Sequence, residues 1–178
     1  MTEPLTFATL RAANLARIPL FKNRAGQIAH SKPDGSDWTP AQWLLAVAGE
    51  AGEAANVYKK MFRGDGVPLK ALADELADVA IYWDLLGVRM GVPADPGQIN
   101  QWKFKHYITP PQERFLGLFI QIGRLADPTK TEEEHLNAYF CIVEVLVGIA
   151  RAHDIDLGEA VRSKFNEVSR RVGAEVYL

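Results

Sequence analysis

The chain has 178 residues, a net charge of −2 and one cysteine, with 48% hydrophobic and 24% charged residues. This length suffices for one globular domain with a substantial core, and the composition is not that of a disordered chain. The small net charge argues against a nucleic-acid partner, which requires a clustered basic face. The lone Cys141 argues against a disulfide framework, and we expect it to be buried as a small hydrophobe.

We expect the protein to act in the cytoplasm. The first 17 residues lack the basic region and apolar core of a secretory signal. No apolar run reaches the length of a membrane span, because even the one that begins at Leu136 is short and interrupted by polar residues. We therefore expect no membrane partner.

Apolar residues recur with the 3.6-residue period of an α-helix along almost the whole chain, and no segment alternates as a strand would. The sequence therefore predicts an all-α fold. A first short helix is expected over about residues 5–20, with Pro19 marking its end. A loop rich in Gly, Pro, Ser and Asp follows over residues 22–37.

The next helix has a well-marked start. Thr39 and Gln42 form a T-x-x-Q capping box, and Trp38 and Trp43 occupy the two positions of a hydrophobic staple. The helix is expected to run to about Met61 and to end in the R-G-D-G turn that follows.

Two acidic pairs are the most informative feature of the sequence. Glu50 and Glu53 lie in this helix, and Glu75 and Asp78 lie in a partner helix expected over about residues 69–90. Each pair has i,i+3 spacing, so its two carboxylates share one face, which is otherwise apolar. The short loop makes the helices antiparallel neighbours, so the two pairs can face each other.

Clustered carboxylates on apolar faces are unfavourable unless protons or a cation neutralise them. Four oxygen donors without Cys or His nearby suit Mg²⁺ or Mn²⁺. Residues 38–90 are therefore predicted to form a metal-binding hairpin. The alternative is a structural cluster of charges.

The second half repeats this plan. Helices are expected over about residues 110–125 and 131–153, the latter opened by a Thr131/Glu134 capping box. Aligning GEAGEAAN with IQIGRLAD places Gln121 and Arg124 where the first hairpin has acids, so residues 110–153 read as a degenerate second hairpin. The two hairpins predict a four-helix-bundle core, flanked by the N-terminal helix and by a last helix over about 157–172 within residues 154–178.

The motifs W-T-P-A-Q-W, G-E-A-G-E-A, E-L-A-D-V-A-I-Y and D-I-D-L-G-E-A-V-R-S-K-F-N-E-V-S resemble those of the MazG-like, all-α nucleoside triphosphate pyrophosphohydrolases, over residues 38–90 and 154–173. The resemblance implies one MazG-like domain over residues 1–178. It also implies that the four acids bind Mg²⁺ while a (deoxy)nucleoside triphosphate is hydrolysed to its monophosphate and pyrophosphate. The additional segment, residues 91–153, resembles the internally duplicated dUTPase branch, so completion of the site by a second chain stays open.

Within this resemblance, Glu53 is our candidate for the catalytic base as well as a metal ligand. Cations after the first acidic pair and on the last helix are expected to bind pyrophosphate, although a solvated helix end explains the first group equally well. Other polar and aromatic side chains are expected to hold a phosphate, the sugar or the base, although the tryptophans also serve as a staple and Asn14 as a helix cap. The candidates for binding pyrophosphate are Lys59, Lys60 and Arg63, after the first acidic pair, and Lys164 with Arg170 or Arg171, on the last helix. The candidates for holding a phosphate, the sugar or the base are Tyr82, Asn14, Trp38, Asn166 and Ser169.

The sequence thus predicts a Mg²⁺-dependent dNTP pyrophosphohydrolase that controls the nucleotide pool. A guanine nucleotide is preferred by analogy with phage-encoded MazG-like enzymes, and dUTP or dCTP is the alternative. We expect a homo-oligomer, a dimer or a tetramer, because a bundle rich in Ala and Leu can expose an apolar face.

Two other functions fit the sequence less well. A di-iron carboxylate protein needs two Glu-x-x-His pairs, and the sequence offers only Glu132 with His135. An idle oligomerisation or regulatory module would gain stability by replacing its acids with apolar residues. No role is assigned to His30, His106 or His153.

Overall fold

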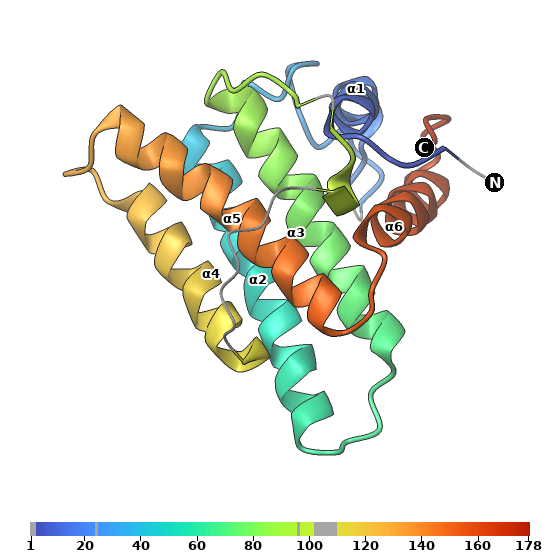
Figure 1. The fold of residues 1–178 in the computed structure, drawn as a ribbon. Coiled ribbons are helices and arrows are strands. Elements are labelled where there is room, and N and C mark those ends of the chain that lie inside the picture. Colours follow the sequence, from blue (N-terminus) through green and yellow to red (C-terminus); the bar gives the residue numbers. More distant parts are fainter. Residues whose placement is uncertain (1–2, 24, 96, 102–109) are drawn as a thin grey trace.

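The computed structural model describes residues 3–101, apart from 24 and 96, and residues 110–178 (Figure 1). The described residues form α-helices and two short 3₁₀ turns, with no strand among them, which confirms the predicted all-α class. The helices are α1 (Phe7–Arg17), α2 (Pro40–Phe62), α3 (Leu69–Arg89), α4 (Pro111–Ala126), α5 (Glu132–Ala152) and α6 (Leu157–Val172), and the 3₁₀ turns are η1 (Ile18–Leu20) and η2 (Ile99–Gln101).

Side chains at the helix starts explain why two of these helices begin where they do. The Thr39 hydroxyl accepts a hydrogen bond from the Gln42 amide, and the Gln42 side chain accepts one from the Thr39 amide. Thr131 and Glu134 make the same reciprocal pair at the start of α5. Both predicted capping boxes are confirmed, and each satisfies amides that a helix start leaves unpaired.

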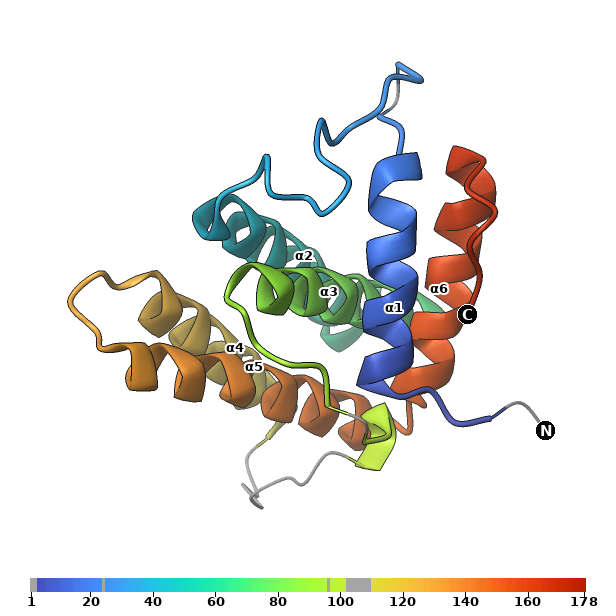
Figure 2. The same cartoon turned by 90° about the horizontal axis from the view of Figure 1, so that it is seen from above.

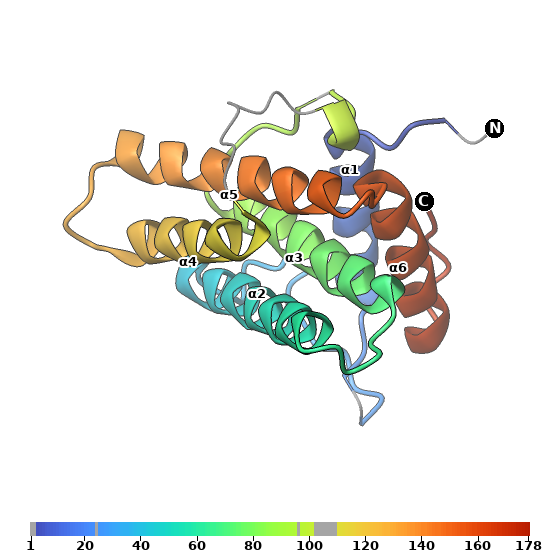
Figure 3. The same cartoon turned by 60° about the horizontal axis from the view of Figure 1, so that its bottom comes forward.

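The four-helix core consists of two hairpins. Helices α2 and α3 pack against each other along their lengths, as do α4 and α5, and the two hairpins meet through α2 with α4 and α3 with α5 (Figures 1 and 3). Helices α1 and α6 flank α3 on its remaining side (Figure 2). As a result α3 is surrounded by α1, α2, α5 and α6.

Aromatic packing joins the two hairpins. The Trp83 indole stacks on the Tyr139 ring with centroids 4.5 Å apart, and its Nε1 donates to the Tyr139 carbonyl oxygen at 2.9 Å. Gly87 lies against the same tyrosine, because a Cβ atom at this position would come within 2.1 Å of the Tyr139 hydroxyl. Close contact of α3 with α5 therefore depends on a residue without a side chain at position 87.

Helix α5 departs from expectation in two respects. By length and composition it is apolar enough to cross a membrane, since its most apolar 18-residue window has a mean hydropathy of 1.3. The sequence was expected to contain no such run. Half of that window is buried inside the protein, and core helices of soluble proteins pass the same test. Cys141 in this helix is half-buried rather than buried.

Candidate metal centre

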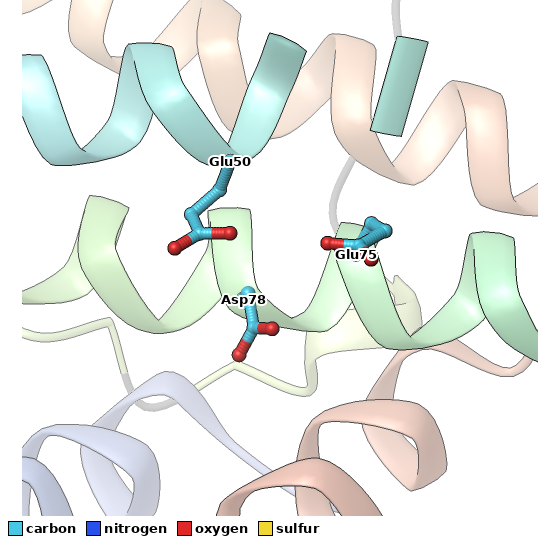
Figure 4. Close-up of side chains that lie close together, drawn as sticks. All are labelled: Glu50, Glu75 and Asp78. Atoms are coloured by element: carbon cyan, nitrogen blue, oxygen red, sulfur yellow. The ribbon is translucent and has the colours of Figure 1, made fainter. Parts of the chain in front are cut away.

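Three of the four predicted acids meet between α2 and α3. Glu50 projects from α2 toward α3, where Glu75 turns its carboxylate toward Glu50 and Asp78 lies close to both (Figure 4). Each offers one carboxylate oxygen, and these oxygens all lie within 4.8 Å of one another. All three side chains are half-buried. Glu53 is exposed and lies outside this group, although it lines the same cavity.

The carboxylates disfavour one another's ionisation. Burial raises the pKa of Glu50 to about 7, and the negative charges of Asp78, Glu53 and Glu75 act in the same direction. Burial also raises the pKa of Glu75, with a further contribution from Glu53. A cation between these groups would remove both the desolvation cost and the repulsion.

The donor set fits a hard divalent cation. Glu50, Glu75 and Asp78 supply oxygen only, which Mg²⁺ and Mn²⁺ prefer, and no thiol or imidazole belongs to the group. Two ligands of one Mg²⁺ are separated by about 4.2 Å at most. Neighbouring ligands of the same octahedral ion are only about 3 Å apart, so oxygens within 4.8 Å of one another would need side-chain movements of up to about 2 Å, which half-buried carboxylates can make.

Lys164 of α6 already neutralises part of this charge. Its Nζ lies 3.0 Å from Asp78 Oδ2. Burial lowers the pKa of Lys164, but the bond to Asp78 outweighs this effect and the pKa is raised. Burial in turn raises the pKa of Asp78 in spite of Lys164. The positive charge of Lys164 alone thus does not neutralise the negative charge of the three acids.

The acids form one wall of a cavity of about 310 Å³. Its other walls carry three cations, Arg17, Lys164 and Arg171, from α1 and α6. Tyr82, on the same face of α3 as Asp78, also lines the cavity, as predicted. Acidic and basic side chains thus line the same cavity, and one pair of them, Asp78 and Lys164, is in direct contact.

Arg17 was not identified from the sequence. The side chain is buried, with its guanidinium 3.5 Å from the centroid of the Phe165 ring, and Nη1 donates to the Phe165 carbonyl oxygen at 3.0 Å. Burial lowers its pKa to about 10, and Tyr82 and Asp78 oppose this shift. Arg17 is therefore a fixed cation at neutral pH, held by α6 in the lining of the cavity that also contains the acids.

An aromatic group closes the cavity beside the loop that precedes α2. His30 is buried and stacks on Trp43 with centroids 5.2 Å apart, and its Nδ1 lies 3.3 Å from Asp37 Oδ1. Both rings line the cavity, a position of His30 that the sequence did not indicate. Trp38 packs on Trp43 at 4.8 Å, as a staple does, and does not line the cavity. His106 lies outside the described residues.

Asn14 lies in the cavity wall and belongs to a buried polar network. Its Nδ2 donates to Asp84 Oδ2 at 2.9 Å and to the Ile81 carbonyl oxygen at 3.4 Å. Asp84 also accepts a hydrogen bond from Arg11 Nε at 2.8 Å. Asn14 Oδ1 is buried without a hydrogen-bond partner among the described residues. Asp84 was missed, because only the packing of α1 on α3 brings these groups together.

The cations at the end of α2 are not brought to the cavity. Lys59, Lys60 and Arg63 do not line it, and Arg63 forms an ion pair with Asp65. The reason is the rise of the helix: Lys60 follows Glu50 by ten residues, or about 15 Å. They remain near the helix end, where the macrodipole favours positive charge.

Two candidates of α6 point elsewhere. Asn166 donates to the Leu178 carbonyl oxygen and accepts from the Leu178 amide, so it fixes the C-terminal segment. The Arg170 guanidinium lies 5.7 Å from the centroid of the Tyr177 ring. Arg171, the alternative to Arg170, lines the cavity instead.

The other sequence candidates take structural positions. Ser169 is buried and accepts a hydrogen bond from Arg17 at 3.5 Å. Glu132 is exposed, and His135 Nε2 lies 2.9 Å from the Asp127 carbonyl oxygen, so this pair forms no di-iron site. In the second hairpin Arg124 is exposed and donates to Gln121 Oε1 at 3.5 Å.

A second cavity of about 820 Å³ adjoins the first and shares Phe21 and Arg171 with it. Lys22 and Asn23 also line it, and none of its described lining residues is acidic. The second cavity therefore carries positive charge from Lys22 and from Arg171, which it shares with the first cavity.

Comparisons with known proteins found no family model, no curated protein and no solved structure that matches this chain.

Proposed function

We propose that this protein is a Mg²⁺-dependent nucleoside triphosphate pyrophosphohydrolase, which converts a (deoxy)nucleoside triphosphate and water to the monophosphate and pyrophosphate. The observation that carries the proposal is the convergence of Glu50, Glu75 and Asp78 on a cavity whose other walls hold Arg17, Lys164 and Arg171. Such opposed charges suit a polyanion that arrives with a divalent cation. The motif resemblance supports the same reaction class.

Glu50, Glu75 and Asp78 would hold the Mg²⁺, or Mn²⁺ in its place, with Glu53 as a fourth acid at the cavity wall. When bound, the ion supplies a Lewis acid that polarises phosphate oxygens. The chain itself supplies the remaining groups, and their positions favour particular roles.

Glu53 is the proposed general base, because it is exposed and lies outside the three-acid group. A carboxylate that is not engaged by the metal can accept a proton from an attacking water within hydrogen-bond reach. Arg17 holds positive charge at a fixed point, since Phe165 packs on its guanidinium. Lys164 is placed to turn from Asp78 to a phosphate oxygen once that acid is neutralised.

The decisive assay presents the protein with all dNTPs and NTPs in Mg²⁺ and identifies the products as monophosphate plus pyrophosphate or diphosphate plus phosphate. We expect pyrophosphate release that EDTA abolishes and that Glu75→Gln and Asp78→Asn each lower at least about 100-fold. Glu175→Gln, an exposed change of the same kind, is the control. Release from no nucleotide, or full activity after removal of the acids, would refute the proposal. The same panel tests the preference for a guanine nucleotide over dUTP and dCTP.

The expected homo-oligomer has a candidate surface. Leu45 on α2 is 72% exposed, and Leu116 and Ile120 on α4 are 63% and 56% exposed. The two helices pack together, so these side chains lie on adjacent elements. Exposed apolar side chains of this size are typical of protein interfaces. Light scattering coupled to size-exclusion chromatography tests the prediction, and Leu116→Glu should shift an oligomer toward the monomer.

A further inference from the structure

We propose that Asn14 presents a fixed hydrogen-bond acceptor to the cavity, that the nucleoside part of the substrate meets it with an N–H or O–H donor, and that Asp84 and Arg11 are positioning residues for this contact. The inference rests on the proposed function and goes beyond it, because it states which end of the nucleotide faces α1 and which chemical group that end must carry.

The orientation of the Asn14 amide is determined by its neighbours. A side-chain amide can present either its oxygen or its nitrogen, and rotation by 180° exchanges them. Here Nδ2 lies 2.9 Å from Asp84 Oδ2 and 3.4 Å from the Ile81 carbonyl oxygen. The reversed amide would place an acceptor against two acceptors. The Ile81 carbonyl oxygen, which can only accept, favours the same orientation as the closer Asp84 carboxylate.

Arg11 holds Asp84 in turn. Its Nε lies 2.8 Å from Asp84 Oδ1, and its Nη1 donates to the Val92 carbonyl oxygen at 2.9 Å. Asp84 is fully buried and does not line the cavity. The amide nitrogen of Asn14 is thus hydrogen-bonded to groups of the protein. The amide oxygen is the atom left to accept a hydrogen bond from a ligand in the cavity.

That oxygen lacks a partner. Asn14 is only 1% exposed, and Oδ1 has no hydrogen-bond partner among the described residues. A buried acceptor without a donor is unfavourable, whereas nearly all such groups in folded proteins are paired. A ligand in the cavity that brings a donor would satisfy it.

The missing group must be a donor, which restricts the ligand. An ionised phosphate offers acceptors only and is disfavoured beside Oδ1. Ring N–H groups, exocyclic amino groups of a base and sugar hydroxyls are donors. The nucleoside part therefore lies toward Asn14 on α1, and the triphosphate lies toward Lys164 and the acids.

The test compares the best nucleotide substrate with analogues that each lack one donor: N-methylated or deaminated bases, and sugars without the 2′- or 3′-hydroxyl. For the wild type we expect the analogue that lacks the donor opposite Asn14 to lose about 10- to 100-fold in kcat/KM. Asn14→Leu, similar in size but without polar atoms, should abolish this discrimination while keeping the Mg²⁺ requirement. Asn56→Leu makes the same change at an exposed position outside the cavity and should discriminate as the wild type does.

Asp84→Asn tests the positioning role, because it removes the charge that selects the amide orientation. We expect reduced discrimination with the metal requirement intact. If this variant does not fold, Asn14→Leu decides alone. Undiminished discrimination by Asn14→Leu, or a wild type that releases pyrophosphate equally from every analogue, would overturn the inference and leave the proposed function standing. A wild type that releases pyrophosphate from no nucleotide would overturn both.

Discussion

Replacing Glu50 by glutamine should stabilise the protein when no divalent cation is present. In the folded protein burial and three neighbouring acids raise the pKa of Glu50 from 4.5 to about 7. The folded state therefore binds this proton more tightly than the unfolded state. The stability that Glu50 contributes is complete below pH 4.5 and is lost as pH rises to about 7.

The raised pKa corresponds to a cost of at most about 3.4 kcal/mol for the ionised side chain. Because Glu50 is only half-buried, solvent screening reduces this to about 1–2 kcal/mol. Glutamine has a similar shape and no charge. In EDTA at pH 8 we therefore expect Glu50→Gln to raise the free energy of unfolding by about 1–2 kcal/mol, and at pH 4.5 we expect no difference.

Urea unfolding followed by circular dichroism measures both values, with Glu175→Gln as the control that should show no change at either pH. Adding Mg²⁺ at about 100 times its Kd should stabilise the wild type by about 2.7 kcal/mol and should stabilise Glu50→Gln much less. An equal or lower stability of Glu50→Gln at pH 8 in EDTA, or a difference that does not depend on pH, would refute this account of the acidic group.

Three further changes test other parts of the structure. Gly87→Ala should lower the free energy of unfolding by about 1–3 kcal/mol, because its new methyl group would overlap the Tyr139 hydroxyl; an unchanged urea midpoint would contradict the close packing of α3 on α5. Thr39→Ala should cost about 1 kcal/mol through loss of the capping box, which Thr39→Ser should largely restore in the same assay. If Arg171 contacts the triphosphate, Arg171→Gln should lower kcat/KM about 10-fold or more, whereas Arg170→Gln, which lies outside the cavity, should not; equal effects would argue for bulk charge instead of contact.

Local signals in the sequence predicted most of the fold. The capping residues Thr39 and Thr131 fix two helix starts through contacts three residues away, so no tertiary information is needed. Glu50, Glu75 and Asp78 were found for a similar reason, since helical spacing and a short loop suffice to bring them together.

The residues that were missed or misplaced depend on contacts between distant segments. Arg17 reaches the cavity because α1 packs beside α6, almost 150 residues later in the chain. Asn14 and Asp84 meet across 70 residues. Arg171 and Arg170 are adjacent in sequence, and only the rotation of α6 about its axis decides which one lines the cavity. The sequence therefore indicated that basic residues would accompany the acidic motif, but it did not identify which basic residues line the cavity.

The central position of α3 has a consequence for hydrogen exchange. This helix contacts four others and carries Glu75 and Asp78, whereas α4 packs mainly on α5 and α2. Backbone amides of α3 should therefore exchange with deuterium only when the whole molecule opens, while those of α4 can exchange through local fraying. A ligand anchored to this helix would therefore slow exchange at every amide that needs global opening, including amides far from the point where it binds, and would leave the locally fraying amides of α4 unchanged.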